Sequence, residues 1–440
     1  MRKKIFLSFL ILFLCSLVYG QEKNVWSLEK CINYAIENNL QIKQQENAVQ
    51  QAKNNITQAQ LSFLPTLSGS MSHGMNWGRS VNLQDLEIVK NKLSQSTSAN
   101  LSASLNIFEG FSKHNNLKSV KKSLDITIQN VEKQKNDISI SIAQAYLQIL
   151  LSEKIRQAAD ESYKSIESQV ERTKKLVDAG SQAYSTLLEI QAQLGSEKVQ
   201  LVAAENDVRT NYLALKQLLD LQNDEVFNII IPDISNLISF FDGREIEDIY
   251  HRSLGLPQIK AAEISLEKSR IDYKIQRGRA YPSISLNAGY GTYYSDNSKT
   301  AFFKQFNDNK NPSVSFGLSI PIFNGWQNNT AIRNARLEIK NSEIDLKLKH
   351  QTLYKEIQQA FNNALSAFEK MRASEQTMKS TQESFDYVEK KFSVGLLNGT
   401  DYTVSKANLF KAKSDYYQSV YQYIFQTKIL DFYTGTPLQL

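Results

Sequence analysis

The sequence is poor in the residues that build metal sites and disulfide frameworks. Its 440 residues include only two cysteines and four histidines. One cysteine, Cys15, falls in an N-terminal leader, so the mature chain keeps Cys31 alone and has neither an internal disulfide nor a thiolate metal cluster. Cys31 lies between Leu28 and Ile32 in a helical pattern, which predicts a buried structural thiol. No histidine has a second histidine or a cysteine at ligand spacing, so we expect no metal and no cofactor.

The sequence also lacks the short motifs of common enzymes. It has no glycine-rich phosphate loop and no Gly-x-Ser-x-Gly turn for a nucleophilic serine. Its carboxylates lie on helix patterns rich in lysine and glutamine, where they are ordinarily solvated. The formal net charge of +6 is spread along the chain rather than gathered into basic blocks. We therefore expect no catalytic residue and no nucleic-acid partner.

Long apolar runs are absent except at the N-terminus. Residues 1–20 begin with Met-Arg-Lys-Lys, continue with an apolar run and end at Gly20, which is the arrangement of a secretory signal peptide. Lipidation at Cys15 is the alternative, but Leu14 before it is bulkier than the small residue that such sites carry. The rest of the chain has no apolar stretch near the ~20 residues of a transmembrane helix. Such an exported chain is periplasmic, secreted, or inserted in an outer membrane through β-strands.

What the sequence does contain is an internal repeat. Motifs recur at a fixed distance (322 − 107 = 215): Ile107-Phe108-Glu109-Gly110 as Ile322-Phe323-Asn324-Gly325, Ala145-Tyr146 as Ala360-Phe361, and Ala179-Gly180 as Val394-Gly395. This predicts a duplication, with repeats at 21–243 and 244–440 after the signal peptide.

Each repeat is predicted to have the same order of elements. An amphipathic helix (roughly 27–63 and 246–279) ends before a proline, two strands enclose a polar loop, and two long helices are separated at Gly180 or Gly395. The joining segment 220–243 is expected to carry a short strand.

Apolar residues recur every seven positions in the four long helices, which predicts coiled coils. The companion positions are only partly apolar, since Val120 is followed by Thr127, Gln134 and Ser141. This favours narrow contacts, as in the wall of a hollow bundle, over a filled core. As a helix, the segment 113–177 would be about 100 Å long. The seam residues are Leu117, Leu124, Val131, Ile138 and Ala145; Leu187, Leu194, Leu201, Val208 and Leu215; Ile332, Ile339, Leu346, Leu353 and Ala360; and Tyr402, Leu409, Tyr416, Tyr423 and Leu430.

Four segments alternate apolar residues with small polar ones. Their period suits either a soluble sheet with one face on a core or membrane strands with apolar residues toward lipid. Three features favour the membrane: the polar positions are Ser, Asn or Gly rather than charged, aromatic residues crowd the strand ends, and the leader exports the chain. Four strands cannot close a barrel, which needs about eight, so a barrel must be shared between chains. The residues expected to face lipid are Leu101, Leu105, Ile107, Leu286, Phe316, Leu318 and Ile320.

In this order and in duplicate, the motifs resemble the TolC-like outer-membrane efflux protein family. The residues that carry the resemblance are Leu28-Glu29, Ala35-x-x-Asn38-Asn39-Leu40, Leu64-Pro65, the two Phe-x-Gly turns, Ala145-Tyr146, Gly180 with Leu187-Leu188, and Val394-Gly395 with Thr400-Asp401. The resemblance implies a mainly α protein with a transmembrane β part. In a homotrimer, three sets of four strands would form a twelve-stranded barrel in the outer membrane, and the paired long helices would form a twelve-helix coiled-coil tunnel across the periplasm.

The resemblance also implies partners. The protein would be the passive channel of a tripartite efflux or type I secretion system, and would work with a periplasmic membrane-fusion adaptor protein and an inner-membrane pump. The loops at 76–97 and 295–311 would face the exterior.

Roles for the two turns between the long helices follow from the same resemblance. The turns would be the tips where the adaptor docks; an ordinary glycine cap after a helix is the alternative. Asp401 matches a position whose carboxylate lines the constricted periplasmic end, and Thr186 is its equivalent in the other repeat. The family's second acid, three residues on, is Val404 here. Alternatively, Asp401 simply favours a helix N-terminus. The tip residues are Ala179, Gly180, Ser181, Val394, Gly395, Leu396, Asn398 and Gly399.

Two other functions are compatible with parts of the sequence. A soluble periplasmic coiled-coil scaffold or adaptor would use helical hairpins, but it does not account for four alternating strands in matched pairs. A surface adhesin or secreted filament would use long helices, but it does not account for the duplication. Only the channel must be extracted from the outer membrane with detergent.

Overall fold

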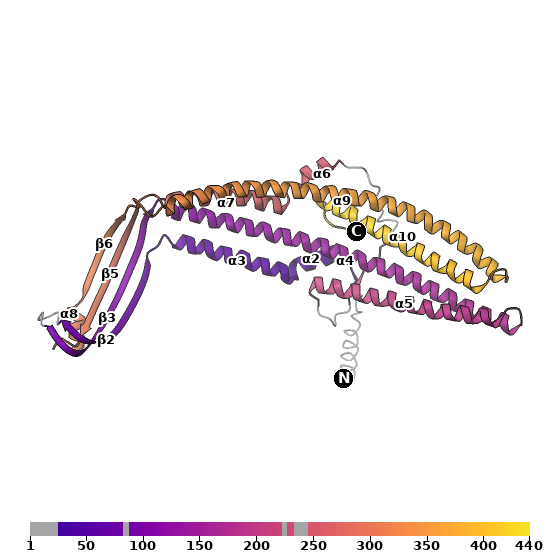
Figure 1. Ribbon diagram of the computed structural model, residues 1–440, viewed down its shortest axis with the longest axis horizontal. Helices are drawn as coiled ribbons and strands as arrows, with labels where there is room; N and C mark the ends of the chain where they lie inside the picture. Colours follow the sequence, from indigo (N-terminus) through magenta and orange to yellow (C-terminus); the bar gives the residue numbers. More distant parts are fainter. Residues whose placement is uncertain (1–24, 82–87, 222–226, 233–244) are drawn as a thin grey trace, which may run out of the picture. The chain divides into compact units, whose positions relative to one another are not determined.

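The computed structural model describes residues 25–81, 88–221, 227–232 and 245–440 (Figure 1), so the predicted signal peptide at 1–20 lies outside it. Within these residues, no helix combines the length and the apolar character needed to cross a membrane. The elements are β1 (Val25–Trp26), α2 (Leu28–Asn38), α3 (Leu40–Leu61), β2 (Thr66–Val81), β3 (Ile88–Glu109), α4 (Ser112–Asp178), α5 (Tyr184–Leu219), β4 (Asn228–Ile229), α6 (Ile246–Ser253), α7 (Pro257–Gly278), β5 (Ser283–Ser295), α8 (Phe302–Asp308), β6 (Asn311–Ser319), α9 (Gln327–Ser393) and α10 (Gly399–Tyr433).

The chain divides into two units, each drawn from both halves of the sequence. The helical unit comprises Met1–Gln45, Val131–Leu256 and His350–Leu440, and the sheet unit comprises Glu46–Asn130 and Pro257–Lys349. The long helices α4 and α9 contribute residues to both units. The predicted repeats at 21–243 and 244–440 are therefore different divisions of the chain from these units.

The four long helices have the predicted duplicated layout. Helices α4 and α9 each contain 67 residues, and their first residues are 215 apart (327 − 112 = 215). Helices α5 and α10 begin at the same distance (399 − 184 = 215). Every predicted seam position in these helices is buried or half-buried. The seven-residue pattern therefore identified the packed side of all four helices correctly.

The two shorter amphipathic helices, each predicted from its apolar pattern to be continuous, are both interrupted. Asn39 separates α2 from α3 with an extended backbone (φ −60°, ψ 129°). Its side-chain oxygen accepts hydrogen bonds from the backbone N–H groups of Gln41 and Ile42, at 2.9 and 3.4 Å, and so caps α3. In the second half Pro257 is the first residue of α7. A backbone N–H at this position would have no acceptor within the helix, so the N–H that proline lacks is not missed there.

The sheet has the antiparallel order β2-β3-β5-β6 (Figure 1). The prediction of a loop at 76–97 is wrong for residues 76–81 and 88–97, because β2 continues to Val81 and β3 starts at Ile88. This stretch is rich in serine and asparagine and shows little alternation, yet its backbone pairs across the hairpin. The loop predicted at 295–311 lies between β5 and β6 and contains the short helix α8. Gln305 of α8 is buried and donates to the carbonyl oxygens of Ser295 and Thr300.

The register gives the sheet two chemically different faces. Leu105 lies opposite Leu286, and Leu286 lies opposite Phe316, so apolar side chains form a row across β3, β5 and β6. On alternate positions Ser104 donates a hydrogen bond to the side chain of Asn287 at 2.9 Å, and Asn287 lies opposite Ser315. One face is therefore apolar, and the other carries small polar side chains.

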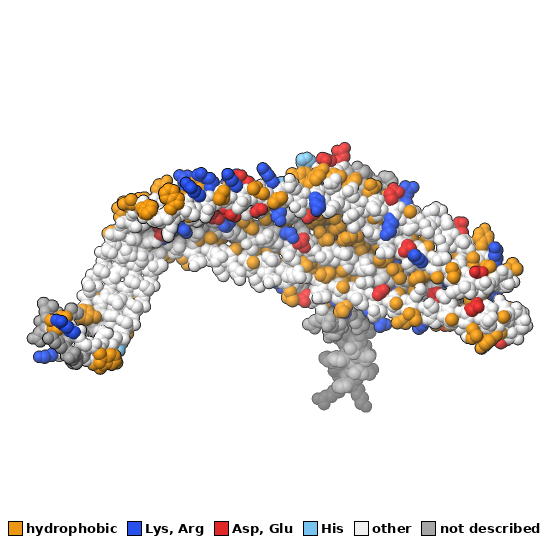
Figure 2. Space-filling model, viewed as in Figure 1, with side chains coloured by type: hydrophobic (Ala, Val, Ile, Leu, Met, Phe, Trp, Pro, Cys, Tyr) orange, Lys and Arg blue, Asp and Glu red, His pale blue; other side chains and the backbone are white. Residues whose placement is uncertain are grey.

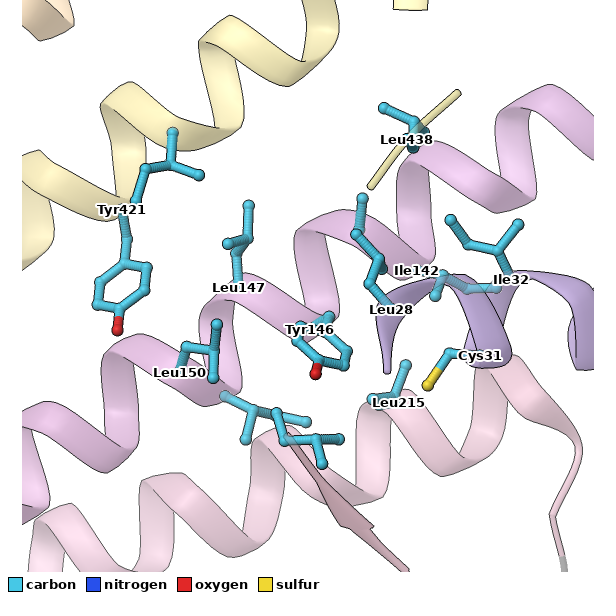
Figure 3. Close-up of a cluster of buried hydrophobic side chains, with 14 of the residues drawn as sticks. Leu28, Cys31, Ile32, Ile142, Tyr146, Leu147, Leu150, Leu215, Tyr421 and Leu438 are labelled. Atoms are coloured by element: carbon cyan, nitrogen blue, oxygen red, sulfur yellow. The ribbon is translucent and has the colours of Figure 1, made fainter. Parts of the chain in front are cut away.

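The helical unit has a hydrophobic core around α4 (Figure 3). Tyr146 of α4 donates a hydrogen bond to the carbonyl oxygen of Ile230 at 2.7 Å and lies 3.2 Å from that of Trp26. These contacts connect α4 to the parallel strand pair β1–β4. Strand β4 is the short strand predicted in the joining segment. Cys31 is fully buried in this core, as predicted, and burial raises the pKa of its thiol to about 12.

Candidate functional site

Two turns with the same pattern of backbone hydrogen bonds join the long helices. At the end of α4, the N–H of Gly180 donates to the carbonyl oxygen of Val177 at 2.9 Å, and that of Ser181 donates to Leu176 at 2.8 Å. At the end of α9, Gly395 donates to Phe392 at 3.1 Å, and Leu396 donates to Lys391 at 2.9 Å. Both glycines have a positive φ, 71° and 77°. These are Schellman caps, which need a residue in the left-handed conformation.

All the predicted tip residues except the buried Gly399 lie on the surface of the helical unit. Ala179, Gly180 and Ser181 are exposed in the first turn. In the second turn Val394 and Leu396 are 69% and 72% exposed. Two apolar side chains held in solvent at a turn are available to a partner, because nothing in the described chain covers them.

The second turn is more tightly organised than the first. Asn398 caps α10 by accepting a hydrogen bond from the N–H of Asp401 at 2.8 Å. Its equivalent before α5, Ala183, has no capping side chain. Gly399 is buried, and a Cβ atom added there would collide with the carboxylate of Glu189 on α5. Glycine at position 399 therefore allows α10 to start directly beside α5.

The two residues predicted at the constriction occupy equivalent places in the first turns of α5 and α10. Asp401 is exposed, and Thr186 is half-buried. The N–H of Thr186 donates to the carbonyl oxygen of Ala183 at 3.1 Å. The carboxylate of Asp401 stands at a helix N-terminus, where the helix dipole favours a negative charge.

An apolar cluster beneath the turns ties all four long helices together. Its buried members are Ile166, Ile190, Phe385, Phe392, Tyr402 and Leu409. The ring of Tyr402 stacks on that of Phe392 with centroids 4.7 Å apart. Arg172 of α4 adds a polar contact, donating at 3.4 Å to the carbonyl oxygen of Ser393 at the end of α9. The two hairpins are thus joined through side chains near their tips.

A buried lysine lies next to this cluster. Lys406 of α10 is only 9% exposed; its amine donates to the Ser165 hydroxyl at 3.0 Å and lies 4.9 Å from the centroid of the Phe385 ring. Burial lowers the pKa of Lys406, while the carboxylates of Glu389 and Glu197 oppose this effect. Glu197 is itself 2% exposed and accepts from Gln193 at 2.8 Å. Sequence reasoning missed this group because Ser165 and Lys406 meet only when the two hairpins pack.

Six of the seven strand residues predicted to face lipid lie within strands: Leu101, Leu105 and Ile107 in β3, Leu286 in β5, and Phe316 and Leu318 in β6. Ile107 occupies a β-bulge of β3, since Asn106 pairs with Ser285 and Phe108 pairs with Ile284. Ile320 is the exception, because it follows β6, which ends at Ser319.

In the described residues, no group of three His, Cys, Asp or Glu side chains could hold a metal ion. The histidines instead serve local structure; for example, the Nδ1 atom of His73 lies 2.9 Å from the hydroxyl of Thr97.

Comparison with known proteins identifies the family. The model of the outer membrane efflux protein family matches residues 31–220 and 254–436, which is most of the chain. Outer membrane protein TolC of Vibrio cholerae is 23% identical over 202 residues, which cover 44% of this chain and 44% of that relative. The matched segment thus spans less than half of the relative's length.

Solved structures of similar fold extend over nearly the whole chain. CusC is 18% identical with a TM-score of 0.76, covering 93% of this chain and 92% of that one. The Campylobacter jejuni CmeC outer membrane channel is 16% identical with a TM-score of 0.74, covering 96% and 91%. VceC of Vibrio cholerae is 15% identical with a TM-score of 0.72, covering 94% and 97%. The resemblance recognised in the sequence is therefore confirmed, and the chain belongs to the outer membrane efflux protein family.

Proposed function

We propose that this protein is the outer-membrane channel of a tripartite efflux or type I secretion system. It would be a passive homotrimer, with a barrel in the outer membrane, a helical tunnel in the periplasm, and energy supplied by an inner-membrane pump. Two observations support this proposal: the chain belongs to the outer membrane efflux protein family, and its sheet has one apolar face and one face of small polar side chains.

The sheet is the observation that carries the proposal. Its apolar row includes Leu105, Leu286 and Phe316, and its opposite face carries serine, asparagine and glycine. Such a sheet suits lipid on one side and a wet lumen on the other. In the described residues β2 and β6 each have a neighbour on one side only. Free edges need partners, and three copies with four strands each would close a twelve-stranded barrel without any free edge.

The long helices supply the second part of the proposal. Each chain has two hairpins of long helices whose inward seams are apolar and whose other surfaces are largely polar. Three copies would provide twelve helical segments for a coiled-coil tunnel. Narrow seams suit a wall one helix thick, because each helix then needs apolar contacts only with its neighbours.

The turns are assigned to the closed end of the tunnel. The exposed Val394 and Leu396, together with the turn at Ala179–Ser181, would receive the adaptor protein. Asp401 would line the constriction, with Thr186 beside it. Because Asp401 is exposed and charged, it would favour cations at the narrowest point.

Single-channel recording tests the proposal directly. Full-length protein, purified in detergent, is added to one side of a planar lipid bilayer, and its mass is measured in parallel by light scattering. We expect discrete current steps of low conductance from a species three times the mass of the monomer. A protein that stays soluble without detergent and never inserts would instead be a soluble coiled-coil scaffold.

A further inference from the structure

Three arginines and two aromatic rings lie together in the sheet unit, close to the ends of its strands. Arg277 belongs to the last turn of α7, just before β5, while Arg333 and Arg336 belong to the first turns of α9, just after β6. We call Tyr273, Arg277, Trp326, Arg333 and Arg336 the arginine–aromatic cluster.

The rings hold the guanidinium groups near one another. Arg336 donates a hydrogen bond to the hydroxyl of Tyr273 at 3.2 Å, and its guanidinium carbon lies 5.8 Å from the centre of that ring. Arg277 lies 5.9 Å from the same ring. Arg333 lies 5.9 Å from the ring of Trp326. These are cation–π distances, at which a ring orients a guanidinium without neutralising it.

The positive charge of the cluster is not balanced locally. In the described part of the chain, none of its arginines forms an ion pair with a carboxylate, whereas Arg270 on the same helix α7 pairs with Glu343 of α9 at 3.3 Å. All three cluster arginines are exposed. The hydrogen bond from Arg336 lowers the pKa of Tyr273, which reports the positive potential at this place. A guanidinium with unused N–H groups is well shaped for the oxygens of a phosphate.

Exposed apolar side chains adjoin the cluster. Ile322 and Phe323, between β6 and α9, are 92% and 81% exposed, and Trp326 and Tyr281 are also exposed. Figure 2 shows hydrophobic side chains gathered where the strands meet the helices, with Lys and Arg side chains beside them along α7 and α9. Aromatic and basic residues together at the end of membrane strands are typical of the level of lipid headgroups.

We propose that the arginine–aromatic cluster binds the phosphate of anionic phospholipids, in the leaflet nearest the long helices. This inference rests on the proposed membrane location of the strands. The apolar side chains would enter the acyl region, and the three guanidinium groups would contact the headgroup. The uncompensated charge favours an anionic lipid over a zwitterionic one.

Lipid selectivity in vesicles tests the proposal. Full-length protein is reconstituted in phosphatidylcholine vesicles containing a trace of spin-labelled phosphatidylglycerol or spin-labelled phosphatidylcholine, and the motionally restricted fraction of each is measured. The test variant is R277Q/R333Q/R336Q. The control is K347Q/K349Q/K355Q, which removes the same charge from exposed positions farther along α9.

We expect the wild-type protein and the control to restrict phosphatidylglycerol more than phosphatidylcholine, by on the order of fivefold for each arginine engaged. The test variant should lose most of this preference, while its trimer mass and channel conductance remain. High salt should weaken the preference in the wild type.

Three results would overturn the proposal in distinguishable ways. If neither lipid is restricted, the strands do not enter the bilayer, and the proposed function fails with it. If the wild type restricts both lipids equally, or the test variant behaves as the control does, only the lipid site fails. If the test variant loses its trimer mass while keeping its lipid preference, the arginines contact a second copy of the chain instead.

Discussion

At the scale of single residues, Lys406 is a charge in a place where lysine is rarely found, because only 9% of it is exposed. Burial lowers its pKa below the ordinary value of 10.5. Between the two pKa values the folded chain binds fewer protons than the unfolded chain. The destabilisation caused by burying the ammonium is therefore complete below the lowered pKa and disappears as the pH rises toward 10.5.

This linkage predicts how Lys406→Met behaves. Removing the desolvated charge should make the variant as stable as the wild type or more stable at neutral pH, by up to about 1 kcal/mol. The difference in unfolding temperature between the variant and the wild type should then become smaller as the pH rises, because the buried amine of the wild type loses its proton and no longer destabilises the fold. Thermal unfolding in detergent, followed by circular dichroism at several pH values, measures it. Lys411→Met, at an exposed position, is the control. If the unfolding temperature of Lys406→Met differs from that of the wild type by the same amount at every pH, the argument is contradicted.

Asp401 offers a second prediction at this scale, which tests its proposed place in the constriction. Asp401→Ala should lower the preference for cations or raise the conductance of the closed state, because a negative charge leaves the narrow end. Thr186→Asp adds a carboxylate at the equivalent position and should raise the cation preference. Reversal potentials in a salt gradient measure both. Asp415→Ala, exposed farther along α10, should change nothing; unchanged selectivity in Asp401→Ala would mean that this carboxylate only caps its helix.

The sequence revealed some of these residues and not others, for a physical reason. The burial of Cys31 follows from its place in a local helical pattern, so the sequence alone predicts it. The contact between Gly399 and Glu189 and the contact between Lys406 and Ser165 depend on how one hairpin packs against another. Nothing local to Lys406 distinguishes it from the solvated lysines of the same helix, because the seven-residue pattern reports only apolar positions.

At the scale of elements, the two turns between the long helices can be tested for backbone strain. Gly180→Ala and Gly395→Ala place a Cβ on a residue with φ of 71° or 77°, although nothing lies within 4 Å of either position. Each change should therefore destabilise the protein by about 1–2 kcal/mol through the backbone alone. Gly195→Ala is the matched control, since it lies inside α5 with open space around it and should stabilise the helix by about 0.5–1 kcal/mol. Unfolding temperatures in detergent measure the effect of all three substitutions. The explanation requires that Gly180→Ala and Gly395→Ala lower the unfolding temperature and that Gly195→Ala raises it.

Elements were predictable to the extent that apolar periodicity marks them. The seams predicted four long helices because twenty apolar positions that follow one seven-residue pattern outweigh local irregularities. The break at Asn39 was missed because it lies within an amphipathic pattern and depends on one capping side chain. The extension of β2 and β3 through 76–81 and 88–97 was missed because serine and asparagine conceal alternation, whereas backbone pairing across a hairpin does not require apolar side chains.

At the scale of the whole molecule, the proposed channel depends on which face of the sheet would meet lipid. Phe316 and Ser315 are neighbours near the middle of β6, and their side chains lie on opposite faces. Phe316→Lys would place an ammonium in the hydrocarbon, at a cost of about 2–4 kcal/mol at the midplane. It should reduce the amount of protein recovered in the outer-membrane fraction and its insertion into bilayers.

Ser315→Lys is the matched change on the opposite face. Its ammonium would enter the wet lumen, so membrane recovery should stay normal while the channel becomes less selective for cations. A charge at position 316 is therefore expected to act on assembly, and the same charge one residue earlier on conduction. If Ser315→Lys abolishes insertion and Phe316→Lys does not, the two faces of the sheet are assigned the wrong way round. If both variants insert and conduct as the wild type does, β6 does not lie in a membrane, and the proposed channel would have to be built from another part of the chain.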